Sequence, residues 1–501
     1  MVKVLIATSE AVPFAKTGGL ADVCGALPAE LAKLGNEIGL IMPAYACVKE
    51  AAAADGIELK ETGRTVSIPV GNQIIAGTYL TADLPGNVKG YFVDQPEYFD
   101  RPSLYGENGV DYRDNCERFV FFSRAVLEAI RTLDLEVDLI HCNDWQTALV
   151  PTLIDAEYRI TRGYERLATL LTIHNMAYQG RFWHWDMLLT GLDWRYFNWR
   201  SLEFFGDLNL LKGGIVYADA INTVSPTYAR EIQTPGFGCG LEGVLTQRSN
   251  VLSGILNGVD YGNWNPKTDS FLAASYDADD WQKGKATCKA ELQKTMGLDV
   301  NPDVPIVGFV GRLAEQKGVE LIAQLIRKWS GTENVQWAIL GTGSLELETE
   351  LAKLSKERPH RVAAQLAFSN EMAHKIEAGS DVFLMPSRYE PCGLNQMYSL
   401  KYGTPPLVHA TGGLKDTVVN ATEEAIAAKA ATGFVFYDYD LHALESTLRW
   451  AVTLYNERRD DWNGIVSKGM NQDWSWSRSA NAYSQLYAAT SARVKQIIDV
   501  R

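Results

Sequence analysis

The chain has 501 residues, which is too long for one ordinary hydrophobic core and predicts two or three domains. Hydrophobic residues make up 46% and charged residues 22% of the chain, an ordinary globular mix. The net charge is −14 and the sequence has no basic stripe, which argues against nucleic acid as a general partner.

The seven cysteines are scattered along the chain and form no C-x-x-C pair. We therefore expect reduced thiols, and neither a zinc site nor a disulfide framework. The sequence has no run of about 18 apolar residues, and no signal peptide precedes the strand-like residues 2–7. We expect no membrane span and a cytoplasmic location, or the plastid stroma if a transit peptide has been removed.

Short apolar runs alternate with amphipathic stretches of helical length, for example 22–34 and 319–328. The runs that we interpret as buried parallel strands are 2–7, 38–42, 139–142, 168–173, 220–224, 305–310, 335–340, 382–385 and 406–408. This alternation predicts an α/β protein made of doubly wound, Rossmann-like domains.

The segment SGILNGVD at 253–260 contains several helix and strand breakers, and a new series of strands and helices starts near residue 306. We place the first domain at 1–250 and the second at 251–478. Residues 479–501 are expected to form a helix that packs back on the first domain, and the Ala-rich residues 421–432 to form a surface excursion.

Four glycine-rich or basic segments follow predicted strands: KTGGL at 16–20, GRLAEQKG at 311–318, RYEPCGLN at 388–395 and TGGLKD at 411–416. Glycines allow close approach of a ligand to the backbone, and N–H groups at the start of a helix favour an anion. In open α/β sheets, ligands bind beyond the carboxyl ends of the strands. If the two carboxyl edges face each other across a cleft, these segments predict a phosphate-bearing ligand held between the two domains.

With these four segments, further motifs make the chain resemble the glycogen and starch synthases of bacteria and plastids along essentially its whole length. These motifs are CNDWQ at 142–146, LTIHN at 171–175, LNLLKGGI at 208–215, INTVSP at 221–226, ILNGVD at 255–260 and WSW at 474–476. The resemblance implies the two-domain GT-B fold. It also implies transfer of glucose from ADP-glucose to the non-reducing end of an α-1,4-glucan, with retention at the anomeric carbon. The family, rather than any base-contacting residue, favours ADP-glucose over UDP-glucose.

The resemblance assigns Arg312 and Lys317 to the diphosphate leaving group. They are five residues apart in one strand-to-helix loop, so both can point at the same diphosphate. The alternative is a surface ion pair with Glu315 or Glu320.

In the first domain, the resemblance assigns Lys16 to the phosphates and sugar of the donor, together with the backbone of Gly18 and Gly19. Asp22, in the same segment, is included among the donor-binding residues. A lysine before a glycine pair can also be a solvated loop charge.

The resemblance places Glu390 at the hydroxyls of the transferred glucose. The alternative is a glutamate in the first turn of a helix, favoured by the helix dipole. Related GT-B enzymes have a second glutamate eight positions further on, where this chain has Tyr398, so we do not expect a two-glutamate clamp. The neighbouring residues expected at the donor phosphates are Cys392, Gly393, Leu394, Asn395, Thr411 and Gly412.

By the same resemblance, His174 lies beside the donor sugar without acting as a general base, and Asp144 and Asn257 line the glucose pocket. Phe368 matches the aromatic residue that stacks on adenine, although a core role is the alternative. We identify no nucleophile and favour same-face transfer with the diphosphate as base. No Asp-x-Asp motif sits at a strand end in a setting that resembles the metal-dependent glycosyltransferases, so we expect neither a metal nor another cofactor.

Residues 181–205 carry many aromatic side chains, which suit the apolar faces of glucose rings. Clustered aromatic residues are nevertheless more often part of a core, and Tyr105 is the better single candidate for acceptor contact. Two other functions compete with the proposed reaction: a GT-B enzyme with a different acceptor, and a non-catalytic glucan-binding or granule-priming protein. The presence of Lys16, Arg312, Lys317 and Glu390 together favours catalysis.

Overall fold

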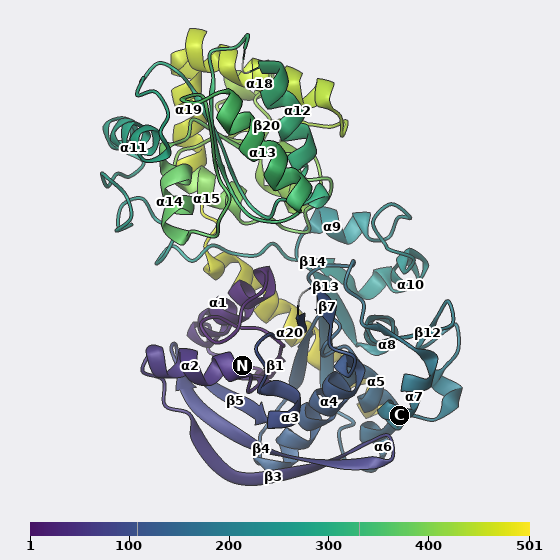
Figure 1. Ribbon diagram of the computed structural model, residues 1–501. Coiled ribbons are helices and arrows are strands. Elements are labelled where there is room, and N and C mark those ends of the chain that lie inside the picture. The colour runs from purple at the N-terminus through teal and green to yellow at the C-terminus, as the bar shows by residue number, and fades with distance from the viewer. Residues whose placement is uncertain (108, 330, 501) are drawn as a thin grey trace. The chain divides into compact units, whose positions relative to one another are not determined.

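The structure is a computed structural model that describes residues 1–107, 109–329 and 331–500. The chain divides into two compact units, Met1–Asn257 with Trp476–Arg501, and Gly258–Ser475 (Figure 1). The sequence analysis put these two boundaries after residues 250 and 478. None of the helices in the described ranges combines the length and hydrophobicity needed to cross a membrane.

Within the described residues, the first unit contains a nine-stranded sheet in the order β14-β13-β9-β8-β1-β2-β5-β4-β3. Its central strands pair in parallel and are almost entirely buried, with mostly apolar side chains, as expected for strands covered on both faces. Five of its strands match predicted ones: β1 (Lys3–Ala7), β2 (Glu37–Pro43), β8 (Leu139–Asn143), β9 (Ala168–Ile173) and β13 (Ala220–Thr223).

Four strands of this sheet were missed by the sequence analysis: β3 (Lys60–Val70), β4 (Gln73–Leu84), β5 (Val88–Asp94) and β14 (Leu252–Gly254). Strands β3 and β4 form an antiparallel hairpin at the sheet edge, and β4 also pairs antiparallel with β5. In β3 only Val66, Ile68 and Val70 are buried, on alternate positions. A search for continuous apolar runs therefore misses a strand that is buried on only one face.

The helices of the first unit that border this sheet or carry its loops are α1 (Gly19–Lys33), α2 (Ala46–Ala54), α3 (Pro96–Phe99), α4 (Asn115–Thr132), α5 (Leu149–Leu153), α6 (Arg159–Thr161), α7 (Met187–Thr190), α8 (Leu210–Tyr217), α9 (Pro226–Glu231), α10 (Glu242–Gln247) and α20 (Trp476–Val500). A small second sheet is formed by β10 (Arg181–Phe182), β12 (Asp207–Asn209) and β11 (Glu203–Phe204). Residues 106–111 add the short antiparallel pair β6 (Gly106–Glu107) and β7 (Val110–Asp111).

Helix α20 is tied to the middle of the large sheet, beside α1 (Figure 1). The hydroxyl of Tyr487 lies 2.8 Å from Nδ1 of His141, in β8, and the other ring nitrogen of His141 lies 2.7 Å from the hydroxyl of Thr172. Asn222 donates a hydrogen bond of 2.9 Å to the hydroxyl of Tyr483. These buried polar contacts join the end of the chain to β8 and β13 directly, and to β9 through His141.

The second unit is built on a six-stranded, all-parallel sheet in the order β17-β16-β15-β18-β19-β20. Its strands are β15 (Ile306–Val310), β16 (Gln336–Leu340), β17 (Val362–Gln365), β18 (Val382–Met385), β19 (Pro406–His409) and β20 (Phe434–Phe436). Its helices are α11 (Trp281–Met296), α12 (Val319–Trp329), α13 (Leu345–Glu357), α14 (Asn370–Gly379), α15 (Asn395–Lys401), α16 (Gly412–Thr417), α17 (Glu423–Ala427), α18 (Leu441–Glu457) and α19 (Arg459–Met470).

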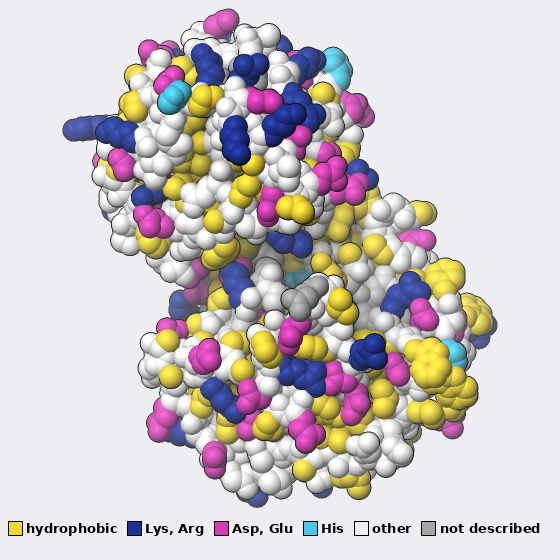
Figure 2. Space-filling view, in the orientation of Figure 1, with side chains coloured by type: hydrophobic (Ala, Val, Ile, Leu, Met, Phe, Trp, Pro, Cys, Tyr) yellow, Lys and Arg dark blue, Asp and Glu magenta, His cyan; other side chains and the backbone are white. Residues whose placement is uncertain are grey.

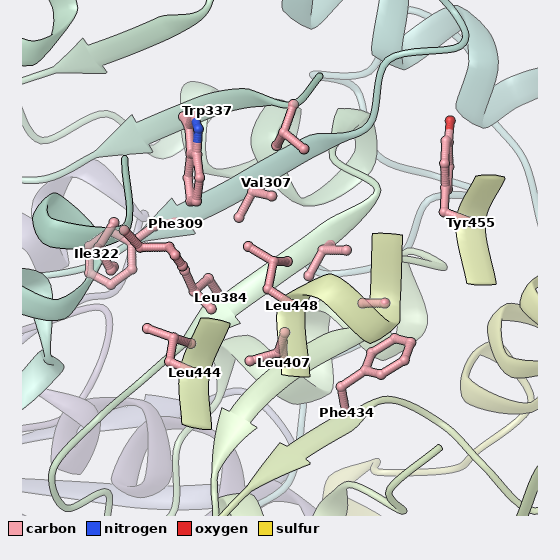
Figure 3. Packing of buried hydrophobic residues seen from close by; sticks show 14 of the residues in the cluster. Val307, Phe309, Ile322, Trp337, Leu384, Leu407, Phe434, Leu444, Leu448 and Tyr455 are labelled. Carbon is pink, nitrogen blue, oxygen red and sulfur yellow. The ribbon is translucent and has the colours of Figure 1, made fainter. Parts of the chain in front are cut away.

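One face of this sheet packs on α12 and α18 through large apolar side chains (Figure 3). Val307, Leu384 and Leu407 come from three neighbouring strands, and Ile322 and Leu448 from the two helices, all of them buried. The predicted strands 305–310, 335–340, 382–385 and 406–408 correspond to β15, β16, β18 and β19. The α/β class with parallel sheets is therefore confirmed.

Replacing Tyr487 with Phe should destabilise the first unit by about 1–2 kcal/mol, because Nδ1 of the buried His141 loses its hydrogen-bond partner. The midpoint of the urea unfolding transition measures this loss. Gln485→Ala, at an exposed position of the same helix, is the matched control. An equal midpoint for Tyr487→Phe and the control would contradict the anchoring role.

Stability of the first unit should fall as the pH drops below about 6.5, the ordinary pKa of histidine. Burial lowers the pKa of His141 to about 3, so the folded state binds fewer protons than the unfolded state between these values. The stabilising contribution is therefore complete above pH 6.5 and is lost progressively toward pH 3. His141→Gln removes the titration and should reduce the slope of unfolding free energy against pH by about 1.4 kcal/mol per unit between pH 6 and 4. Parallel curves for the two proteins would contradict this account.

Candidate active site

In the first unit, the sheet brings Asp144 and His174 together. Strands β8 and β9 are neighbours and parallel, and these two residues follow their carboxyl ends. Asp144 has a left-handed backbone, with φ of 55°, and its N–H donates to the carbonyl of Thr172 at 2.9 Å. Its carboxylate accepts a hydrogen bond of 2.7 Å from the N–H of His174. The carboxylate therefore fixes the backbone at the end of β9.

His174 is held in one orientation by Asn143. The amide nitrogen of Asn143 donates to the carbonyl of Ala7 at 3.1 Å, so its oxygen faces Nε2 of His174, 2.9 Å away. Because that oxygen can only accept, Nε2 carries the proton. Burial lowers the pKa of His174 to about 3, which keeps the imidazole neutral near pH 7.

The carboxyl group of Asp144 is a much weaker acid than an ordinary aspartic acid. Burial raises its pKa to about 7, against the opposing effect of the N–H groups of His174 and Asn175. A carboxyl group whose pKa is raised by burial at a strand end makes Asp144 a candidate functional residue. Asn257, at the end of the first unit, adds a buried side-chain oxygen that has no hydrogen-bond partner among the described residues.

The glycine loop before α1 is organised by Glu10, a residue that the sequence analysis did not identify. The buried Glu10 carboxylate accepts hydrogen bonds from the N–H of Thr17 at 2.5 Å, the hydroxyl of Thr17 at 2.6 Å and the N–H of Gly18 at 3.2 Å. The hydroxyl of Tyr105 also donates to it, at 2.7 Å. The only signal in the sequence was a single acidic residue in the segment between the first strand and the glycine loop.

Lys16 and the two glycines of this loop face open space. Lys16 is half exposed, and its Nζ lies 2.6 Å from a carboxylate oxygen of Asp22. A Cβ added to Gly18 or Gly19 would meet no atom within 4 Å. Local packing therefore does not require glycine here, and the bare backbone at the start of α1 is left accessible to a ligand.

In the second unit, Lys317 and Glu390 form an ion pair of 2.6 Å, from loops that follow the adjacent strands β15 and β18. Ser387 donates a further hydrogen bond of 3.0 Å to the same carboxylate oxygen of Glu390. Glu390 is only 7% exposed, so the pair lies in a protected position where charge interactions are stronger than in bulk water.

The alternative role for Arg312 and Lys317, a surface ion pair with Glu315 or Glu320, is wrong. Glu315 pairs instead with Arg388, and Glu320 accepts a hydrogen bond of 2.8 Å from the hydroxyl of Tyr439. Arg312 is exposed, and its guanidinium donates to the side-chain oxygen of Gln316 at 3.1 Å.

The glycines of the second TGGL segment serve a different purpose from Gly18 and Gly19. A Cβ on Gly412 would lie 1.9 Å from the carbonyl oxygen of Glu390, and one on Gly413 would lie 2.1 Å from that of Cys392. Gly412 also has a left-handed backbone, with φ of 45°. These glycines allow two loops to pack backbone against backbone, which fixes the segment that carries Glu390.

The remaining predicted residues of the second unit lie around this loop. Asn395, the first residue of α15, donates from its side chain to the carbonyl of Val310 at 2.9 Å, which ties the helix start to the end of β15. Gly393 has a φ of 72°, Cys392 and Thr411 are buried, and Leu394 is the residue before α15. Phe368 is 92% exposed, so its interpretation as a core residue is wrong.

A cavity of about 350 Å³ lies in the first unit. Trp145, Phe182 and Gly180 line part of it, and the indole of Trp145 packs so closely on Gly180 that an added Cβ would lie 2.5 Å from the ring. Trp145, which lines the cavity, follows Asp144 directly in the sequence. The hydroxyl oxygen of Tyr105 lies 2.8 Å from the hydroxyl oxygen of Ser9 and 2.7 Å from a carboxylate oxygen of Glu10.

Much of the aromatic cluster at 181–205 lies at the surface, contrary to the expectation of a core. The exposed rings are Trp183, Trp185, Trp194, Trp199 and Phe205, whereas Phe204 is buried. Within residues 1–107, 109–329 and 331–500, no group of three His, Cys, Asp or Glu side chains is arranged to hold a metal ion.

Family models match both halves of the chain. Residues 3–247 match the starch synthase catalytic domain, and residues 296–464 match the glycosyl transferases group 1. Among solved structures, the chain is similar to the catalytic domain of starch synthase IV from Arabidopsis thaliana bound to ADP and acarbose. The TM-score is 0.88 at 33% identity, over 98% of this chain and 99% of that one. It also shares its fold, at 16% identity and a TM-score of 0.60, with sucrose-phosphate synthase from Thermosynechococcus elongatus.

Full-length relatives agree with these matches. The chain is 45% identical to a glycogen synthase from Rhodopirellula baltica over 98% of both chains. It is 44% identical to a glycogen synthase from Koribacter versatilis over 97% of both. The resemblance noted in the sequence is therefore confirmed, and the chain belongs to the glycogen and starch synthase family of GT-B glycosyltransferases.

Proposed function

We propose that this protein is a retaining glucosyltransferase that transfers glucose from ADP-glucose to the 4-hydroxyl group at the non-reducing end of an α-1,4-glucan. The observation that carries the proposal is the protected Lys317–Glu390 ion pair at the carboxyl edge of the six-stranded sheet of the second unit, on a chain that matches glycogen synthases over its full length. A carboxylate for sugar hydroxyls and a cation for phosphate lie side by side there.

Arg312 and Lys317 act on the leaving diphosphate. As the glycosidic bond breaks, negative charge develops on the diphosphate, and cations that are already in position stabilise it without reorganisation. In the free protein the charge of Lys317 is balanced by Glu390, and Ser387 holds Glu390 in place. Arg312 is exposed and can form charge-assisted hydrogen bonds with phosphate oxygens. The backbone of Gly393, Leu394 and Gly412 surrounds the same loop end.

Glu390 accepts hydrogen bonds from hydroxyl groups of the transferred glucose. The residues of the first unit serve the sugar as well: Asp144, whose pKa is raised to about 7 by burial, is partly protonated at neutral pH and can donate or accept. His174 stays neutral and is a weak base, because burial lowers its pKa to about 3, and its Nε2 proton is donated to the side-chain oxygen of Asn143. Lys16, with the open backbone of Gly18 and Gly19, contributes a cation from the first unit.

The exposed Phe368 provides a ring for the nucleobase. ADP-glucose is favoured as donor because the chain is similar to a starch synthase catalytic domain that was solved with ADP. Retention follows if the acceptor hydroxyl attacks from the face that the diphosphate leaves, with a phosphate oxygen accepting its proton. The reaction then uses neither a metal ion nor another cofactor.

Replacing Glu390 with Ala should lower kcat/KM for ADP-glucose by about 10²–10³-fold, because a group that contacts the reacting sugar is lost. Incorporation of labelled glucose into glycogen measures this, with UDP-glucose in parallel. Glu346→Ala, an exposed glutamate in α13, is the control and should retain full activity. Unchanged activity in Glu390→Ala would contradict the proposed site. Absence of transfer from either donor, in a folded protein that still binds glucan, would instead favour a non-catalytic glucan-binding protein.

Glucose transfer should persist in excess EDTA at the rate seen with magnesium, because cationic side chains rather than a metal balance the diphosphate. Initial rates over a series of EDTA and MgCl₂ concentrations test this. A complete loss of activity in EDTA that magnesium restores would contradict the metal-independent mechanism.

A further inference from the structure

Two neighbouring loops of the second unit carry the charged residues of the candidate site. Residues 311–318, after β15, contain Arg312 and are called the arginine loop here. Residues 386–395, after β18, contain Glu390 and are called the glutamate loop. The two strands are adjacent in the sheet, so the contacts between these loops decide where the cation lies relative to the carboxylate.

The side chain of Gln316, in the arginine loop, contacts both loops. Its oxygen accepts a hydrogen bond of 3.1 Å from the guanidinium of Arg312. Its nitrogen donates to the carbonyl of Tyr389, the residue before Glu390, at 3.4 Å. The backbone carbonyl of Gln316 also accepts a hydrogen bond of 2.9 Å from the N–H of Arg388. One residue thus connects the exposed arginine to the segment that carries the glutamate.

Donor and acceptor chemistry fixes the orientation of the Gln316 amide. An arginine side chain can only donate a hydrogen bond, and a backbone carbonyl can only accept one. The amide oxygen must therefore face Arg312, and the amide nitrogen must face Tyr389. A flipped amide would lose both contacts, so the two partners together select a single orientation of the side chain.

Arg312 needs such a support more than Lys317 does. Lys317 is held by its ion pair with Glu390, whereas Arg312 is exposed. A long exposed side chain samples many rotamers, and ordering it during the reaction costs free energy. A hydrogen bond that holds the guanidinium beforehand lowers this cost.

The surroundings of the site do not replace a positioned cation. The chain has a net charge of −14, and the face of the second unit shown in Figure 2 carries Lys and Arg side chains interspersed with Asp and Glu side chains. A diphosphate is therefore attracted by individual cations in defined positions rather than by a broad basic surface.

A second side-chain contact between the two loops provides a matched comparison. Glu315, the residue before Gln316, forms an ion pair of 2.8 Å with Arg388 of the glutamate loop. The two side chains are 73% and 53% exposed, and an ion pair so open to water contributes little. The same turn thus has one contact that involves Arg312 and one that does not.

We propose that Gln316 is a positioning residue, which holds Arg312 in place for the leaving diphosphate and keeps the arginine loop aligned with the glutamate loop. The inference rests on the proposed function for the reaction that Gln316 serves. Negative charge on the diphosphate increases as the glycosidic bond breaks, so a displaced Arg312 weakens the transition state more than the bound substrate. The loss should therefore appear mainly in kcat.

The first test replaces Gln316 with Met, which has a similar length but no amide. We expect kcat to fall about tenfold while KM for ADP-glucose changes less than about twofold. Gln316→Glu should instead raise KM for ADP-glucose, because its carboxylate competes with the diphosphate for Arg312. Glu315→Gln is the control and should keep at least about half of the wild-type kcat. If the urea midpoint shows that Gln316→Met does not fold, the raised KM of Gln316→Glu becomes the test.

A double-mutant cycle shows whether Gln316 acts through Arg312. In an Arg312→Ala background, Gln316→Met should lower kcat by less than about twofold, because the side chain that it holds is already gone. A tenfold loss in both backgrounds would overturn the inference and make Gln316 a general support of the loop. An unchanged kcat and KM in both Gln316 variants would overturn it as well.

Failure of the proposed function is distinguishable, because the wild-type protein would then transfer no glucose. Calorimetric titration with ADP and AMP tests the inference without the reaction. Free ADP carries the negative charge that develops on the leaving group, so Gln316→Met should bind ADP about fivefold more weakly than wild type does. Its affinity for AMP, which lacks the second phosphate, should stay unchanged. Equal affinities of the variant and wild type for ADP would overturn the inference.

Discussion

Parallel strands that lie side by side end at the same edge of their sheet, and the candidate site depends on this constraint in both units. In the second unit, β15, β18 and β19 are consecutive in the sheet, so the loops that carry Lys317, Glu390 and Gly412 meet although they lie far apart in the sequence. In the first unit, β8 and β9 bring Asp144 to the backbone of His174 in the same way.

Within these edges, the loops are fixed by contacts that leave little room for substitution. Gly412 and Gly413 allow backbone to pack on backbone beside Glu390. The carboxylate of Glu10 accepts hydrogen bonds from N–H groups of the loop that carries Lys16. Both arrangements place a charged side chain on a rigid support, which lowers the cost of holding charge in position for a reaction. The two copies of the TGGL motif therefore differ in function: one has an open backbone, and the other supports its neighbour.

Much of the fold could be predicted from the sequence because buried parallel strands have continuous apolar runs, as in β1, β9 and β15. The hairpin of β3 and β4 was missed because its burial alternates along the strand. Glu10 was missed because its partners are backbone N–H groups, which leave no trace in residue types. The sequence left open whether the aromatic residues at 181–205 form a core or contact the acceptor, because clustering in sequence does not reveal that the tryptophans at 183–199 are exposed whereas Met187, Leu192 and Leu202 are buried.

The central claim is that this chain couples cleavage of a sugar nucleotide to the growth of a glucan. The most direct measurement follows ADP release and glucose incorporation into a maltooligosaccharide in the same reaction, with the linkage and anomeric configuration of the product determined by NMR. The account predicts equal amounts of ADP released and glucose added, all of it in α-1,4 linkage. Release of ADP without chain growth, or a product with inverted configuration, would contradict it.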